Sequence, residues 1–166
     1  ADLMTLYPSF DLKVDYHTEL SRLRLAQGNP TQAADLIHEI EASDRQPFYR
    51  SAAAFLACRI HYYLAVEDMA LVEEILDQQD WSLEDKNIFA WAAAFLAYAR
   101  VLIYQEAFQR ANDLLDACRQ KLETYELWTP ALKALILQVC ISQLRGETHT
   151  ARQQIKRALM LAAGES

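Results

Sequence analysis

Turn-forming residues are scarce in this chain. Its 166 residues include 3 Gly and 4 Pro, about 4% together, where an average protein has roughly 12%. It also has only 5 Val, against 26 Ala and 24 Leu. Few turn residues imply few turns, and few β-branched residues argue against a sheet. Because 52% of the residues are hydrophobic, disorder is excluded and an all-α fold is predicted.

The rarity of glycine also excludes several kinds of site. Gly28, Gly146 and Gly164 stand far apart, so the chain has no Walker A loop, no GxGxxG and no GxSxG elbow. A loop that cradles phosphate needs several glycines within a few residues, because bare backbone must approach the anion. We therefore expect no nucleotide site, no enzymatic activity and no cofactor.

The charge balance and the hydrophobic pattern narrow the possible partners. The net charge of −7 and the pI of about 5.1 argue against direct contact with nucleic acid, whose phosphates an acidic surface repels. No apolar run reaches the roughly 18 residues that a membrane span needs. No secretion signal opens the chain, and a start at Ala1 suggests a fragment or a processed start.

The cysteines and histidines show no site pattern. Cys58, Cys118 and Cys140 are odd in number, far apart and set among apolar residues, so we expect three buried free thiols and a cytoplasmic protein. No two His residues are four apart, so no metal site is expected. The acidic pairs are expected to be solvated surface; they are Glu73 with Glu74 and Asp113 with Asp116.

A small apolar residue recurs along the chain at a nearly constant interval. It follows a polar or Gly corner by five residues and precedes an aliphatic residue by four. The residues concerned are Ala33, Val72, Ala111 and Ala151, with spacings of 39, 39 and 40. Two antiparallel helices joined by a tight corner cross near that corner, where a large side chain would force their axes apart. The pattern predicts four helix pairs.

These pairs form a single expected domain over 11–166, after an extended lead-in at 1–10 that ends near Pro8. The repeat units are placed at 11–46, 47–82, 83–128 and 129–163. Apolar periodicity predicts eight helices. Their expected ranges are 11–27, 30–42, 47–65, 68–79, 83–104, 107–124, 129–145 and 148–162.

Capping signals mark several expected helix starts. Asn29-Pro30 supplies an N-cap followed by Pro at the first helical position. Thr129-Pro130 is expected to repeat that device before a helix beginning near Ala131. Ser82 followed by Asp85 resembles a capping box.

The corners within the pairs are of two kinds. Gly28 and Gly146 suit the left-handed conformation that ends a helix. Glu67 and Glu106 hold the same corner without Gly, which predicts a tighter or differently shaped turn there.

The register of the first helices of units two and three is ambiguous. The small-residue pattern gives a period of 39. The segment Ala52–Ala57 is nevertheless echoed by Ala92–Ala97, 40 residues later.

A 39-residue register places Arg22, His61 and Arg100 at equivalent positions in successive units. With Tyr63, Tyr104 and Gln143 nearby, such a column suits a carboxylate, a phosphate or an acidic peptide. The alternative is that these are solvated residues paired with acidic neighbours. Three indole rings at or near helix starts are expected to seal corners between helices rather than bind ligands; they belong to Trp81, Trp91 and Trp128.

The corner pattern resembles the tetratricopeptide repeat (TPR), although the usual period of that repeat is 34. Helix pairs of this larger size are similar to the sensor region of MalT-like bacterial activators, which end in a LuxR-type DNA-binding domain. Ala99–Leu115 resembles that region's penultimate unit, Gly146–Ala162 resembles its last unit, and Leu23–Asn29 also fits.

The resemblance covers about 11–163 and implies an α-α superhelix with a concave groove. It further implies a module for ligand or protein sensing, which controls an ATPase domain and a DNA-binding domain that this chain lacks. The expected partner is a protein, a peptide or a small inducer, and self-association is left open. The alternative is a stand-alone TPR adaptor, chaperone or scaffold that holds a peptide in its groove.

Overall fold

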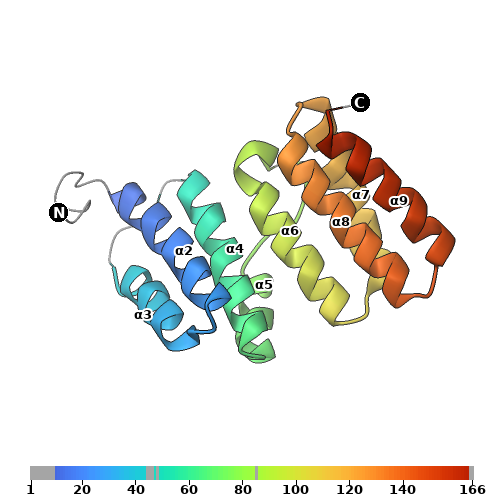
Figure 1. The fold of residues 1–166 in the computed structure, drawn as a ribbon. Helices are drawn as coiled ribbons and strands as arrows, with labels where there is room; N and C mark the ends of the chain where they lie inside the picture. Colours follow the sequence, from blue (N-terminus) through green and yellow to red (C-terminus); the bar gives the residue numbers. More distant parts are fainter. Residues whose placement is uncertain (1–9, 44–46, 48, 85, 165–166) are drawn as a thin grey trace. The chain divides into compact units, whose positions relative to one another are not determined.

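A computed structural model describes residues 10–43, 47, 49–84 and 86–164, and the all-α prediction is confirmed (Figure 1). The described part contains eight helices and no strand. They are α2 (Phe10–Ala26), α3 (Pro30–Glu41), α4 (Tyr49–Ala65), α5 (Met69–Asp77), α6 (Ile88–Tyr104), α7 (Phe108–Thr124), α8 (Trp128–Leu144) and α9 (Thr148–Ala162). The chain forms two compact units, Ala1–Asp80 and Trp81–Ser166.

The first unit holds α2 to α5. Helix α2 packs against both α3 and α4, and α4 packs against α5. Where α2 crosses α3, the Ser21 hydroxyl donates to the carbonyl oxygen of Ala33 at 3.1 Å. Further along, buried His17 lies 3.1 Å from a carboxylate oxygen of Glu39. The pair α2–α3 is therefore held by polar bonds as well as by apolar packing.

The second unit holds α6 to α9. Each helix packs against the next, and α6 also packs against α8. The core between them is a cluster of buried apolar residues: Leu96, Ala99, Leu102, Ala111, Leu115, Ala134, Leu137 and Ile141. Ahead of α6, the Trp81 ring lies edge-on to Trp91 and Phe95. That placement agrees with the sealing role expected of this indole.

The four recurring small residues lie where the expected crossings put them. Ala33, Val72, Ala111 and Ala151 are all 0% exposed. Each sits in the first turns of the second helix of its pair. A longer side chain at these positions is expected to push the paired helices apart.

The first helices of the pairs settle the register. Helices α2, α4, α6 and α8 are each 17 residues long and begin at residues 10, 49, 88 and 128. The interval between α4 and α6 is therefore 39, and the 40-residue sequence echo is out of register by one. Burial agrees, because fully buried Phe95 corresponds to buried Leu56 and not to half-buried Phe55.

The prediction of a different corner at the glutamates is wrong. Glu67 and Glu106 have φ values of 60° and 57°, in the same left-handed region as Gly28 and Gly146 at 71° and 74°. Glu126, between α7 and α8, also has φ 57°. At all five corners this residue's N–H bonds the carbonyl three residues back, and the following N–H bonds the carbonyl five back. All five corners therefore share one backbone structure. At the three corners that have Glu instead of Gly, a side chain in the left-handed region costs free energy.

Two of the expected helix starts are corrected. Helix α6 begins at Ile88, not at residue 83, because the Asn87 side chain accepts the N–H of Phe89 at 3.0 Å. The Ser82 hydroxyl instead accepts the N–H of Glu84 at 3.3 Å. Its expected capping partner Asp85 lies outside the described residues, as do residues 1–9 with Pro8. The lead-in cannot extend to residue 10, because α2 begins there.

The start of α8 also differs from the prediction. It begins at Trp128, so Pro130 is its third residue and Thr129 is not its cap. Proline is tolerated there because the first N–H groups of a helix have no carbonyl partner. At α3 the prediction is confirmed: Asn29 accepts the N–H of Gln32 at 3.3 Å and Pro30 opens the helix.

The cysteines do not behave alike. Cys58 and Cys118 are buried free thiols; burial raises the pKa of Cys58, and it raises that of Cys118 to about 12. Cys140 is exposed, contrary to the prediction, because it lies on the face of α8 that points away from the core.

Across the described residues, none of the helices combines the length and apolarity that a membrane crossing requires. In that same part of the chain no three His, Cys, Asp or Glu side chains could hold a metal ion together.

Candidate functional site

Arg22, His61 and Arg100 occupy the same position in three equal helices. Each is the thirteenth residue of its helix, in α2, α4 and α6 respectively. Arg22 and His61 belong to the first unit and Arg100 to the second. The corresponding residue of α8 is Cys140, so the run of basic side chains stops there.

The surroundings of the two arginines differ. The Arg22 side chain is 44% exposed, and its Nη1 lies 3.3 Å from a carboxylate oxygen of Glu19. A surface pair of this kind contributes little, so an anionic ligand would not have to displace a strong bond. Arg100 is half-buried, and its Nη1 donates to the carbonyl oxygen of Leu96 at 3.1 Å. His61 is also half-buried.

Of the three polar or aromatic residues expected beside this run, two are accessible. Tyr104 and Gln143 are exposed on α6 and α8. Tyr63 is buried, its ring lies edge-on to Tyr62, and burial raises the pKa of its phenol. A ligand on the surface would therefore meet Tyr104 and Gln143 more readily than Tyr63.

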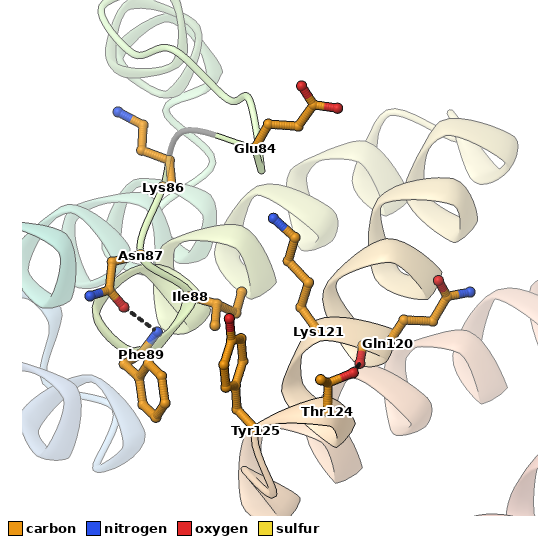
Figure 2. Close-up of a pocket in the computed structure, with 9 residues that line it drawn as sticks. All are labelled: Glu84, Lys86, Asn87, Ile88, Phe89, Gln120, Lys121, Thr124 and Tyr125. Atoms are coloured by element: carbon orange, nitrogen blue, oxygen red, sulfur yellow. Dashed lines mark hydrogen bonds between the residues drawn. The ribbon is translucent and has the colours of Figure 1, made fainter.

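A hollow of about 530 Å³ lies in the second unit, and no sequence motif marks it (Figure 2). It lies between the start of α6 and the end of α7. Figure 2 shows Tyr125 reaching from the end of α7 toward Ile88. The exposed rings of Phe89 and Tyr125 pack with their centroids 5.2 Å apart.

The two ammonium groups of this hollow already have partners. Lys121 Nζ donates to the carbonyl oxygen of Leu83 at 2.5 Å. Lys86 Nζ lies 4.2 Å from the centroid of the Trp91 ring, a cation–π contact. Both lysines thus hold the segment before α6 in place. The two segments that line the hollow are more than 30 positions apart in the sequence. No local motif therefore marks the hollow.

A second, polar hollow of about 410 Å³ lies between α7, α8 and α9. At its floor the Asp116 carboxylate accepts bonds from Arg119 at 2.9 Å and from Gln138 at 3.0 Å. Burial of Asp116 opposes ionisation, but the hydrogen bonds from Gln138 and Arg119, together with the positive charges of Arg119 and Arg157, outweigh it and hold the pKa of that carboxyl below its ordinary value. The sequence pattern predicts that both Asp113 and Asp116 are solvated surface. Asp113 is exposed, but Asp116 is held in these two bonds and is therefore not merely solvated surface.

The polar network extends toward the end of α7. Arg119 also donates to Glu123 at 2.9 Å, and Glu123 accepts from Arg157 of α9 at 3.1 Å. Burial of Arg119 disfavours its charge, but its bonds to Asp116 and Glu123 raise the pKa of the guanidinium overall. The charges alternate in sign along the network, so it ties three helices together and leaves no buried ion without a counter-charge.

The sequence model of one family, described as the MalT-like TPR region, matches residues 9–166. The chain belongs to this family. No curated protein and no solved structure matches it. Membership in the MalT-like TPR region identifies the helix pairs as TPR-type repeats, a class built for interaction with other molecules.

Proposed function

We propose that this MalT-like TPR region is the sensing module of a LuxR-type transcriptional regulator in the cytoplasm. It binds a small inducer or a protein partner and has no catalytic role. Binding stabilises one arrangement of the helix pairs and so controls an ATPase domain and a DNA-binding domain elsewhere in the regulator. The family match over residues 9–166 carries this proposal.

We further propose that the thirteenth-position residues contact anionic groups of the ligand: Arg22 and His61 in the first unit, and Arg100 in the second unit together with Tyr104 and Gln143. Support comes from their equivalent positions in helices of equal length and from the exposure of Arg22. Guanidinium groups bind carboxylate and phosphate through charge-assisted hydrogen bonds. In an acidic protein, this repeated basic position is a departure from the overall charge.

Calorimetric titration of the protein with a Glu-rich peptide tests the ligand contact. We expect the double variant Arg22→Ala, Arg100→Ala to weaken binding by at least about tenfold, because two charge-assisted bonds are removed. Arg24→Ala is the matched control, since Arg24 lies two residues further along α2 and donates to Gln27. If the double variant bound the peptide with the same affinity as the wild type, the proposed ligand contact would be wrong.

The regulatory role has a separate test in the full reading frame. We expect a Walker A loop on the N-terminal side and a helix-turn-helix on the C-terminal side. A full reading frame with neither would leave a stand-alone TPR adaptor and would overturn the proposed control of transcription.

A further inference from the structure

A hollow of about 520 Å³ lies in the second unit, between the end of α7, the start of α8 and the last turns of α9. We propose that it is a binding site for a small aromatic carboxylate. The site is separate from the basic residues at the thirteenth helix positions, and it does not depend on the proposed control of transcription. It rests on the size of the hollow, on its apolar wall and on its charges.

Three helices of the second unit supply the lining of the hollow. Helix α7 contributes Glu123, and α8 contributes Trp128, its first residue. Helix α9 contributes most of the rest, including Lys156, Arg157, Met160 and Leu161. Because α8 packs on both α7 and α9, these walls are held by contacts inside the second unit. The volume falls within the range of about 300–1,000 Å³ that is usual for sites of small organic molecules.

The apolar wall of the hollow suits an aromatic ring. Trp128 and Met160 are 42% and 54% exposed, and Leu161 is half-buried. An indole packs well against another aromatic ring, and the thioether of methionine makes favourable contacts with ring edges. The sequence predicts that Trp128 seals a corner between helices, but a large part of this side chain remains accessible to a ligand.

Two cations of α9 line the same hollow. Lys156 is exposed, and its ammonium group has no hydrogen-bond or ion-pair partner among the residues that the structure describes. Arg157 is also exposed, and its Nη2 lies 3.1 Å from a carboxylate oxygen of Glu123. One of the two cations is therefore available to a ligand without any rearrangement.

The second cation can turn to a ligand at little cost. Glu123 also accepts a hydrogen bond from buried Arg119 at 2.9 Å. Its carboxylate therefore keeps a counter-charge when Arg157 leaves it, and an exposed ion pair such as the one with Arg157 contributes little to stability. Lys156 and Arg157 can then both donate charge-assisted hydrogen bonds to one carboxylate of a ligand.

The charge of this part of the chain favours an anion over a neutral or cationic ligand. Residues 128–166 contain five Lys or Arg and two Glu, although the whole chain has a net charge of −7. A local excess of positive charge raises the concentration of small anions around it. An apolar wall beside two cations thus selects a molecule with a flat apolar body and one negative charge.

Titration with naphthoate, a two-ring aromatic carboxylate, tests the proposal by heteronuclear NMR of the indole N–H groups. The chain has three such groups, in Trp81, Trp91 and Trp128, and only the last of them lines the hollow. We expect a saturable shift of the Trp128 signal and much smaller shifts of the other two. The spectrum of Trp128→Phe assigns the signal.

The neutral amide of the same ring system, naphthamide, measures the contribution of charge. It should bind at least about fivefold more weakly than naphthoate, because it cannot form the charge-assisted bonds to Lys156 and Arg157. Equal affinity for the two compounds would show a general apolar surface and would overturn the proposal.

Two double variants of α9 test the lining directly. Lys156→Gln with Met160→Ala should weaken naphthoate binding by at least about tenfold, since a cation and an apolar contact are removed. The matched control is Arg152→Gln with Leu159→Ala, which makes the same kinds of change at exposed residues of α9 that do not line the hollow. Affinity of the control should equal that of the wild type. Far-UV circular dichroism checks that both variants remain folded, as the exposure of all four residues predicts.

Three further results would contradict the site. The first is a Trp128 signal that does not move at millimolar naphthoate. The second is an equal loss of affinity in the two double variants. The third is a Trp128 signal that moves with protein concentration in the absence of naphthoate, which would assign the hollow to a second copy of the chain.

Discussion

In both units the first helix of each pair has the same length, whereas the second helix differs in length between the units. Helices α2, α4, α6 and α8 all have 17 residues. In the first unit the second helices have only 12 and 9 residues, whereas in the second unit they have 17 and 15.

The connection that follows the second helix differs accordingly. In the second unit α7 turns into α8 through Tyr125, Glu126 and Leu127, with the same left-handed corner that joins the helices within a pair. In the first unit α3 ends at Glu41, and α4 begins only at Tyr49. A full-length second helix with a three-residue corner packs along its whole length against both neighbours. The length of the second helix therefore decides how continuous the core is.

The largest expected effect is on the core of the second unit. Leu115→Ala should lower the free energy of unfolding by about 2–5 kcal/mol, because α6 and α8 close the cavity from both sides. Ile37→Ala in α3 should cost less, because α3 has most of its packing against α2 alone. All three tryptophans, Trp81, Trp91 and Trp128, lie in the second unit. Urea unfolding followed by tryptophan fluorescence therefore reports on that unit, and circular dichroism reports on both. Equal losses for the two variants would refute the difference in core continuity.

Overpacking at the crossings comes next. Ala111→Leu should cost about 1–3 kcal/mol, because Ala111 is fully buried between helices packed along their whole length. Ala33→Leu meets an equally buried site in the shorter α3, which can shift more easily, so its cost should be smaller. Thermal melts of both variants measure the difference. Unchanged midpoints in both would contradict the repeat register itself.

Substitutions at the corners should change stability by a smaller amount, with opposite signs at a glycine corner and at a glutamate corner. Gly28→Ala should destabilise by about 1 kcal/mol through backbone conformation alone, since a Cβ there has nothing within 4 Å. Glu126→Gly should stabilise by up to about 1 kcal/mol, because glycine removes the left-handed penalty at the corner between α7 and α8. Chemical denaturation of both variants measures this. A loss of stability on Glu126→Gly would show that the glutamate side chain compensates.

The smallest effect is on the pH dependence of the polar network. The folded-state pKa of Asp116 is lowered, so its stabilising contribution is present above its unfolded pKa and is lost as pH falls through the folded one. Asp116→Asn should therefore lower stability at neutral pH and flatten the loss of stability in acid. Unfolding midpoints at neutral and acidic pH give the comparison. Glu39, whose pKa is lowered chiefly by its bond from Lys13 and further by His17, should show the same sign in the first unit. An acid profile that is unchanged in Asp116→Asn would contradict the role of that network.

Much of this architecture was predictable from local pattern. The interval between Ala33, Val72, Ala111 and Ala151 identified the pairs, because a tight crossing admits only small side chains whatever surrounds it. The cap at Asn29 was equally readable, since a side chain reaching its own backbone needs no distant partner. The Ala-rich echo was misleading because similar letters need not share a face.

The candidate sites were less predictable. The thirteenth-position basic residues follow from the period alone, but the burial of Tyr63 depends on neighbouring helices. The bonds of Asp116 to Arg119 and Gln138, and the hollow bounded by Lys121 and Phe89, join segments that no local pattern connects.

The sequence by itself determined the helices, their pairing and their period, because backbone propensity and the size of side chains at the crossings act over short distances. Only the tertiary structure decided that the glutamate corners copy the glycine ones, since packing of two long helices outweighs a penalty of about 1–2 kcal/mol in a corner. It also decided which apolar residues are covered. Leu96 and Ile136 occupy equivalent positions, and only the presence of α8 against the first makes one buried and the other exposed.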